Sequence, residues 1–321
     1  MALWSYKITQ FLKATIKLLI LALAFYFVAV HWQKAQTQAH YDPIILSKVL
    51  LSYLNIAILL LLTIINWGLE GLKWRLAVSS QANISFGESL KQILSAHISG
   101  LITPAKVGDF GTKALYYPKE KRKKVFWLSL LSSWYQMLAT LLTAVIGVGY
   151  MIYLYFPTYL LAYLLVVVLS LLCWRHAPRL IEGNQRIKNS IIYLKYRPRF
   201  RVRPQLGRAL LGWALLRYIV FAHQFYFLML VFDVGLSYWL SLALISSIYL
   251  LSSVLPMLQF FDVFLKSSLA VIVFGYFDID QRSGLLIPLI MWLFNVVLPI
   301  LPGTYFLLRL KPQFKSDIKW L

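Results

Sequence analysis

Charged residues and cysteine are scarce in this chain. Only 13% of its residues are charged, against roughly 25% in soluble domains, while 60% are hydrophobic. The single cysteine, Cys173, excludes an intrachain disulfide framework and a zinc site built from cysteines. Among the charged residues the acidic ones are the scarcer, with 11 aspartates and glutamates against 32 lysines and arginines. So large an apolar fraction requires hydrocarbon rather than water around much of the chain.

Several catalytic motifs are also missing. Segment 108–113 reads Gly-Asp-Phe-Gly-Thr-Lys, which lacks the Gly-Lys-Ser/Thr order of a phosphate-binding loop. There is no His-Glu-x-x-His motif and no serine nucleophile elbow. Without an ATP-binding motif, any transport is expected to be passive, driven by an ion gradient or powered by a partner. No cofactor and no metal site are expected, and a transporter is favoured over an enzyme without excluding one. Asp278 and Asp280 keep one alternative open, because membrane glycosyltransferases use such carboxylate pairs to hold metal.

Long apolar runs dominate what is present, and most approach the ~20 residues that cross a bilayer core. An eighth run is interrupted by Asp262 and Lys266. The sequence therefore predicts an all-α polytopic membrane helix bundle of about eight crossings (7–8), forming a single integral membrane domain over 1–321. The predicted spans cover 14–30, 49–67, 125–153, 159–174, 209–231, 238–255 and 285–308, and the interrupted run covers 257–277.

The basic residues orient this bundle. Of the 32 lysines and arginines, 27 lie in the two tails or in the segments 68–124 and 175–208. Because cytoplasmic loops of membrane proteins carry the excess of lysine and arginine, both termini and both segments are predicted to be cytoplasmic. The net charge of +21 is thereby explained by topology, and no nucleic-acid partner is expected. The basic run 119–124 is interpreted as an anchor that also attracts anionic lipid.

The segment 85–117 is too polar for a lipid-exposed span and too apolar for an ordinary loop. Gly100, Pro104, Gly108 and Gly111 interrupt its apolar face. Broken helices at membrane depth are tolerated where they line a cavity or are buried in protein. We therefore expect broken or re-entrant helices near 86–117, with the break at Pro104.

A weaker version of this pattern recurs near 256–277. Asp109 and Lys113 follow the first proline, and Asp262 and Lys266 follow Pro256. The i,i+4 spacing puts each aspartate and lysine on one helical face, where they can pair. Interrupted segments in corresponding positions of two halves point to the central site of a transporter. The pairing also admits a purely structural interpretation, because a charge in the membrane core needs a partner.

Other polar residues lie within or beside the apolar runs. Arg217 either snorkels toward the cytoplasmic end of its span or faces an internal groove, where it can hold a phosphate. His97 and His223 are interpreted as satisfied hydrogen-bonding residues rather than ligands. At the end of the second span, Glu70 is expected to pair with Lys73 or Arg75. Two tryptophans flank this segment and are predicted to lie at headgroup level: Trp67 and Trp74.

The chain resembles the flippase-like family named for the transmembrane region of lysylphosphatidylglycerol synthase. The resemblance rests on segment 100–113, on the basic segment ending at Lys124 and on the long span beginning at Val125. The break at Leu255-Pro256 also fits, although the glycine-rich second break of the family is altered here. The resemblance implies a membrane protein that moves lipids or lipid-linked precursors between leaflets. Because the sequence ends at Leu321, the aminoacyl-transferring domain of larger members is not expected.

Together these features predict a lipid flippase or lipid-handling transporter of the bacterial cytoplasmic membrane, with both termini in the cytoplasm. Its expected partners are anionic membrane lipids, and an envelope-biosynthesis partner or a second copy is a further possibility. A membrane-embedded transferase and a non-catalytic envelope scaffold are the alternatives. The predicted substrate-binding residues are Pro104, Lys106, Asp109, Lys113, Arg217, Asp262 and Lys266.

Overall fold

The computed structural model describes residues 26, 30, 52–103, 106–183, 203–254 and 261–310, and within this part of the chain every regular element is a helix. A π-helical turn at Leu293–Val297 joins α13 and α14 into one helix, and a 3₁₀ turn at Pro157–Tyr159 precedes α7. The helices are α3 (Tyr53–Val78), α4 (Phe86–Ile102), α5 (Val107–Leu115), α6 (Lys119–Tyr155), α7 (Leu160–Gly183), α10 (Pro204–Val231), α11 (Tyr238–Val254), α12 (Asp262–Tyr276), α13 (Gln281–Trp292) and α14 (Leu298–Leu308).

Four helices are long and apolar enough to cross a membrane: α3, α6, α10 and the continuous α13–α14 helix. This agrees with a multi-pass membrane protein. The predicted span 14–30 lies outside the described residues, apart from Tyr26 and Val30, so the count of eight crossings stays a prediction. The segment 68–124, predicted as a cytoplasmic loop, consists largely of helix, because α3 continues to Val78 and α4 and α5 follow.

Local sequence explains where several helices begin. The Ser52 hydroxyl accepts the amide hydrogen of Asn55 at 3.4 Å at the start of α3. The Ser85 hydroxyl accepts that of Glu88 at 3.2 Å at the start of α4. These contacts satisfy amide groups that have no partner in the first helical turn. Pro204 occupies the first turn of α10, where its missing N–H and fixed φ fit the helix.

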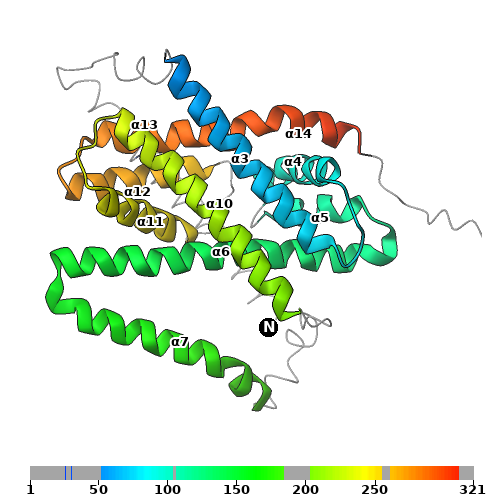
Figure 1. Cartoon of the computed structure of the whole chain (residues 1–321), viewed down its shortest axis with the longest axis horizontal. Coiled ribbons are helices and arrows are strands. Elements are labelled where there is room, and N and C mark those ends of the chain that lie inside the picture. Colours follow the sequence, from blue (N-terminus) through cyan, green and yellow to red (C-terminus); the bar gives the residue numbers. More distant parts are fainter. Residues whose placement is uncertain are drawn as a thin grey trace, which may run out of the picture.

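The helices form two blocks, α3–α6 and α10–α14, with the same internal arrangement. In each block the first helix contacts the second, the second contacts the third and the third contacts the fourth. The blocks also exchange equivalent contacts, because α4 packs against α14 and α11 packs against α6. In Figure 1, α6 and the α13–α14 helix lie on opposite sides, the shorter helices lie between them, and α3 and α10 run diagonally across the front.

The two blocks run in opposite directions. Gln224 on α10 contacts Leu59 and Thr63 on α3, whereas Arg217, earlier on α10, contacts Asn66, later on α3. Later residues of α10 thus contact earlier residues of α3, which means that the two helices are antiparallel. The two blocks are therefore an inverted repeat, with α3 and α10 side by side at its centre (Figure 1).

Glycine permits the two equivalent contacts between the blocks. A Cβ atom on Gly147 of α6 would collide with the Ser246 hydroxyl of α11. A Cβ atom on Gly303 of α14 would collide with the backbone oxygen of Leu94 on α4. Small residues at helix interfaces of membrane proteins allow backbones to approach closely. Each block therefore packs against the other through a glycine on its last long apolar helix, α6 or α13–α14.

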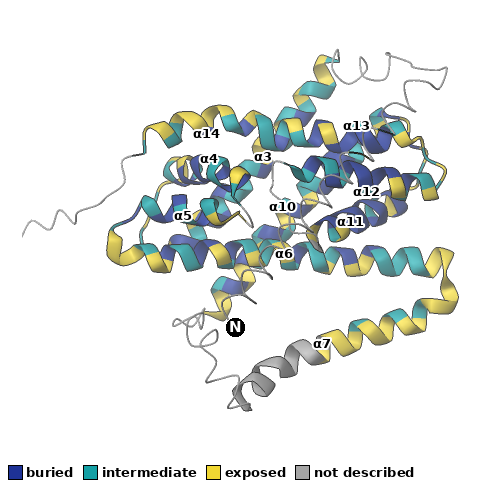
Figure 2. Ribbon diagram, turned by 180° about the vertical axis from the view of Figure 1, so that it is seen from behind, coloured by how far each residue is buried: buried dark blue, intermediate teal, exposed yellow. Residues whose placement is uncertain are grey.

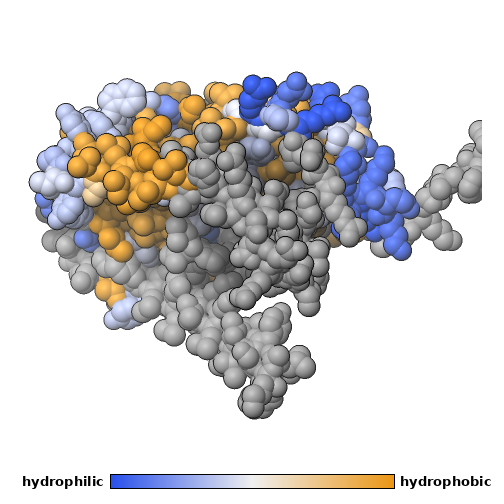
Figure 3. Space-filling model, turned by 90° about the horizontal axis from the view of Figure 1, so that it is seen from below, coloured by the Kyte–Doolittle hydropathy of each residue, from blue (hydrophilic) through white to orange (hydrophobic). Residues whose placement is uncertain are grey.

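Burial follows this arrangement. Residues of α11, α12 and α13 are largely buried, whereas α7 stands apart and its first part, up to Leu172, is mostly exposed (Figure 2). Seen from the side on which α7 lies, apolar side chains gather toward one end and hydrophilic side chains toward the other (Figure 3). Exposed leucines such as Leu161 and Leu165 make α7 suited to contact with hydrocarbon.

Candidate functional site: a charged cluster at the centre of the repeat

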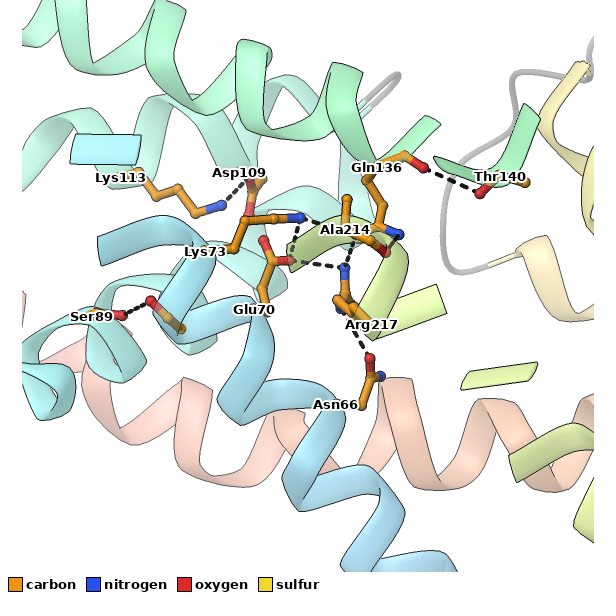
Figure 4. Close-up of polar contacts among 11 residues, drawn as sticks. Asn66, Glu70, Lys73, Ser89, Asp109, Lys113, Gln136, Thr140, Ala214 and Arg217 are labelled. Carbon is orange, nitrogen blue, oxygen red and sulfur yellow. Dashed lines mark hydrogen bonds and ion pairs between the residues drawn. The ribbon is translucent and has the colours of Figure 1, made fainter. Parts of the chain in front are cut away.

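Glu70 is the centre of an ion triad that joins the two blocks. One of its carboxylate oxygens, Oε2, lies 2.6 Å from Nζ of Lys73 and 2.9 Å from a terminal nitrogen of Arg217. Lys73 is one turn further along α3, and Arg217 comes from α10 (Figure 4). The side chain of Lys73 is only 1% exposed, whereas those of Glu70 and Arg217 are 14% and 24% exposed. Within the triad, Arg217 is therefore the side chain most accessible from outside the bundle, and Lys73 is inaccessible.

Gln136 connects this triad to α6. Its side-chain oxygen accepts hydrogen bonds from Lys73 at 3.1 Å and from Arg217 at 3.4 Å. Its side-chain amide donates to the backbone oxygen of Ala214 on α10 at 3.2 Å. One neutral amide oxygen thus accepts hydrogen bonds from both cations and adds no charge to the triad (Figure 4).

A chain of buried amide side chains continues from Arg217. Its Nε donates to Asn66 at 3.0 Å, Asn66 donates to Asn295 at 3.0 Å, and Asn295 donates to Gln224 at 2.8 Å. The Gln224 amide then donates to the backbone oxygen of Leu59 and to the Thr63 hydroxyl. Asn295 lies in the π turn at Leu293–Val297. Single π turns inside α-helices occur frequently at functional sites, where they redirect side chains and free carbonyl groups.

The π turn also contacts helix α4. His97 on α4 is bonded to the backbone oxygen of Val296 at 3.1 Å. The ring of Trp67 packs edge-on against His97, with 4.9 Å between the ring centroids. His223 likewise contacts the backbone of Ile219 and the hydroxyl of Tyr238, both at 2.8 Å. Both histidines therefore have hydrogen-bond partners, as the sequence predicted.

Helices α4 and α5 form an antiparallel hairpin. The Thr112 hydroxyl donates to that of Ser99 at 2.7 Å, and the hydroxyls of Ser95 and Tyr116 are 2.9 Å apart. The break between the helices includes Pro104, which lies outside the described residues. Lys106, at the start of α5, has a left-handed backbone with φ of 58°. Such a conformation is uncommon for a residue other than glycine, and it turns the chain into α5.

The predicted pair on this hairpin is formed. Nζ of Lys113 lies 2.8 Å from a carboxylate oxygen of Asp109 and 5.1 Å from the ring centre of Trp74. The indole of Trp74 donates to Gln92 at 2.8 Å and is fully buried. Trp74 therefore does not face lipid or solvent, and its predicted headgroup level stays a prediction. Its ring packs inside the protein because α4 and α5 cover the end of α3.

The second predicted pair is formed on α12. Nζ of Lys266 lies 2.6 Å from a carboxylate oxygen of Asp262 and 5.4 Å from the ring centre of Tyr249 on α11. These side chains are 25% and 30% exposed, so this pair is more accessible than the pair on α5. The equivalent helices α5 and α12 of the inverted repeat thus each carry an aspartate and a lysine one turn apart.

The two halves of the repeat meet electrostatically at Lys106. Its ammonium group interacts with Asp109 beside it, with Asp262 and Lys266 on α12, and with Arg217 on α10. Glu70 in turn interacts with Lys113 as well as with its two direct partners. All these groups therefore form one charged cluster, with five cations and three carboxylates. Its members are Lys73, Lys106, Lys113, Arg217, Lys266, Glu70, Asp109 and Asp262.

Six of the seven predicted site residues belong to this cluster. The structure resolves the two interpretations of Arg217, because its guanidinium faces Glu70 and Asn66 inside the bundle. The predicted pair of Glu70 with Lys73 is confirmed, but the sequence did not place this pair in the site and gave no sign of its second partner, Arg217. Sequence reasoning also missed a set of amide side chains, although an amide within an apolar run is itself a signal for a buried polar contact. These residues are Asn66, Gln136, Gln224 and Asn295.

The carboxylate pair of the alternative transferase site has a different environment. Asp280 precedes α13, and its side chain accepts the amide hydrogen of Arg282 at 3.1 Å. Asp278 has a left-handed backbone with φ of 53° in the same turn. Over the described ranges, no three His, Cys, Asp or Glu side chains gather as a metal site would require. The capping contact gives Asp280 a local structural role.

No family model matches this chain, and comparisons with curated proteins and with solved structures find no match either. The resemblance to the flippase-like family therefore stays a prediction based on the sequence motif.

Proposed function

We propose that this protein binds an anionic lipid headgroup in the charged cluster and moves the lipid between the two leaflets of a membrane. The observation that carries the proposal is the excess of positive charge in that cluster, where five cations share three carboxylates. A charge inside a membrane protein is costly unless it is paired. A cluster with two surplus positive charges is therefore suited to an anionic ligand.

Phosphate chemistry supports this choice of cargo. A charged headgroup crosses hydrocarbon slowly because it must lose its hydration without a compensating partner. Guanidinium holds phosphate through two parallel hydrogen bonds, and ammonium groups bind it as point charges. Arg217 and Lys106 are accessible members of the cluster and could supply both kinds of contact. They would replace water around the headgroup during its passage.

The inverted repeat supports a transport function. Many secondary transporters contain two oppositely oriented repeats, with broken helices around a central site. Here the break before α5 and the start of α12 both contribute to the charged cluster. We infer that the α4–α5 hairpin enters from the cytoplasmic side and the α11–α12 hairpin from the opposite side. Helix α5, with 9 residues, spans only about 14 Å and cannot cross the bilayer core alone.

This placement changes the proposed number of crossings. The predicted span 14–30 together with α3, α6, α7, α10 and the α13–α14 helix gives six crossings rather than eight. An even number keeps both termini on the cytoplasmic side, as the distribution of basic residues predicts. The proposed location remains the cytoplasmic membrane of a bacterium.

Reconstitution into liposomes tests the function. Fluorescent phosphatidylglycerol on the outer leaflet is quenched by a membrane-impermeant reductant, so protein-dependent loss of protected lipid reports movement. We expect the wild-type protein to accelerate movement, and Arg217→Gln and Lys113→Gln to slow it by about ten-fold, because each loses one charged hydrogen-bond donor. Lys91→Gln is the matched control, because Lys91 is 47% exposed and pairs with Glu88 outside the cluster.

Wild-type movement no faster than in protein-free liposomes would overturn the proposal. Unchanged rates in both Arg217→Gln and Lys113→Gln would remove the charged cluster from the path of the lipid. Both results are interpretable only with protein that elutes as a single folded species, so size-exclusion chromatography accompanies each assay.

A further inference from the structure

We propose that Glu70 takes up a proton when an anionic headgroup enters the charged cluster, so that a proton moves together with the lipid. This inference rests on the proposed function and adds a coupling ion to it. It follows from the position of one carboxylate between the two cations that a headgroup must reach.

The geometry makes Glu70 a direct competitor of the ligand. A single carboxylate oxygen lies 2.6 Å from the ammonium group of Lys73 and 2.9 Å from the guanidinium of Arg217. Arg217 is the more exposed of these two cations and is the one that a headgroup meets first. A phosphate bound to Arg217 would therefore compete with the carboxylate of Glu70 for the same guanidinium group.

Two anions that share the same cations at this depth repel each other strongly. Where two acidic groups occupy one site of low polarity, the charged form of one of them is disfavoured. A phosphodiester remains ionised at neutral pH, so Glu70 is the group that can become neutral. The step is a simple proton transfer: a hydronium ion from solution loses one O–H bond and becomes water, the O–H bond of the Glu70 carboxylic acid forms, and the ion pair with Arg217 is released.

The surroundings of Glu70 favour this assignment. The charged groups that face it are Lys73 on its own helix, Lys113 on α5 and Arg217 on α10. Helix α6 contributes the neutral Gln136, and the π turn contributes Asn295 through Asn66. On α4, the titratable His97 contacts Trp67 and the backbone of Val296 rather than Glu70. Glu70 is thus the carboxylate of this triad, and every other member is cationic or neutral.

The other two carboxylates of the charged cluster do not share this property. Asp109 and Asp262 each pair with a lysine one turn away on the same short helix. A headgroup that binds Arg217 leaves these pairs intact, because their lysines remain beside them. Among the ion pairs of the described residues, only the Glu70–Arg217 pair joins the two blocks, so its release removes one of the contacts that hold them together.

Proton uptake on ligand binding tests the inference without a transport assay. The full chain in detergent, in weakly buffered solution at pH 7.5, is titrated with dihexanoyl-phosphatidylglycerol while a soluble pH indicator reports protons. We expect the wild-type protein to take up about one proton for each lipid bound. Glu70→Gln should bind the same lipid, because the amide mimics the protonated acid, and should take up none.

Two controls separate the coupling from general effects. Glu88→Gln removes an exposed carboxylate, 45% accessible and paired with Lys91, and should behave as wild type. The double variant Glu70→Gln/Lys73→Gln removes the carboxylate together with one buried cation, so it remains informative if the single variant fails to fold. Dihexanoyl-phosphatidylcholine, which has no net charge, should cause little uptake.

The possible outcomes separate the proton coupling from the lipid-binding function. Lipid binding by the wild-type protein without proton uptake overturns the coupling and leaves the lipid-binding function standing. Uptake that persists in Glu70→Gln assigns the proton to another group and overturns the role of Glu70. Absence of any binding by the wild-type protein overturns both proposals.

Discussion

The guanidinium of Arg217 lies 2.9 Å from the carboxylate of Glu70, and these two residues belong to oppositely oriented halves of the chain. The same guanidinium donates to Asn66, which lies one turn before Glu70 on α3. Arg217 therefore links the charged cluster to the chain of buried amides. A change at this residue should affect the stability of the bundle as well as its proposed function.

Arg217→Met should lower the free energy of unfolding by about 1–3 kcal/mol, because hydrogen bonds to charged groups contribute about that much when a buried partner is lost. Lys73 stays beside Glu70, so the carboxylate keeps one cation. Unfolding in detergent with increasing dodecyl sulfate measures the change. In a double-mutant cycle, Glu70→Gln/Arg217→Met should cost less than the sum of the single changes. Simple additivity would argue against a direct interaction.

Asn295→Leu should destabilise the π turn and its neighbours. Asn66 and Gln224 would each lose a hydrogen-bond partner in a buried position. Hydrogen bonds between membrane helices contribute about 0.6 kcal/mol on average, so we expect a loss of about 1–2 kcal/mol for the pair. Thermal unfolding followed by tryptophan fluorescence checks this, with the exposed Thr304→Val as the control on the same helix. Equal midpoints for both variants would contradict the expected role of Asn295.

Gly303→Ala should weaken the contact between α14 and α4. The added methyl group would collide with the Leu94 backbone, which cannot rotate away as a side chain could. Overpacking of this kind typically costs about 1–3 kcal/mol. Gly212→Ala on α10 is the matched control, because nothing lies near its added Cβ atom, and it should be neutral or stabilising. A Gly303→Ala protein as stable as Gly212→Ala would show that the helices separate freely there.

Cysteine labelling should report the proposed orientation. In a Cys173→Ala background, Ser80→Cys lies between α3 and α4, and Gly235→Cys lies between α10 and α11. Both positions are exposed. A membrane-impermeant maleimide added to intact cells should label Gly235→Cys and reach Ser80→Cys only after the membrane is opened. Labelling of both sites in intact cells would exclude an arrangement in which these turns face opposite sides.

Much of this architecture could be predicted from local patterns. Apolar runs gave the long helices, the proline and glycines near Pro104 indicated the α4–α5 break, and i,i+4 spacing predicted both aspartate–lysine pairs. These features depend on residues close together in the chain. Their physical causes, helix periodicity and backbone restriction by proline, act over a few residues and can be recognised without the fold.

The contacts between the blocks could not be predicted in the same way. Glu70 and Arg217 lie on separate helices, and nothing in their spacing shows that α3 and α10 run side by side. All ten basic residues of segment 68–124 count toward the cytoplasmic side in the orientation of the chain, yet Lys73 and Lys113 are buried in the bundle. The positive-inside rule counts lysines by position along the chain and does not distinguish a headgroup anchor from a buried member of an ion pair.

The π turn at Leu293–Val297 sets the helical phase of everything that follows it. Because this turn accommodates one extra residue, its conversion to a regular α-helix with the same number of residues would turn α14 by about 100° relative to α13. Gly303 would then leave the backbone of Leu94, and a bulkier side chain would face α4 in its place. The position of Gly303 against α4 therefore depends on the π turn as well as on the glycine itself, so a substitution that straightens the turn would disturb this contact even with Gly303 in place.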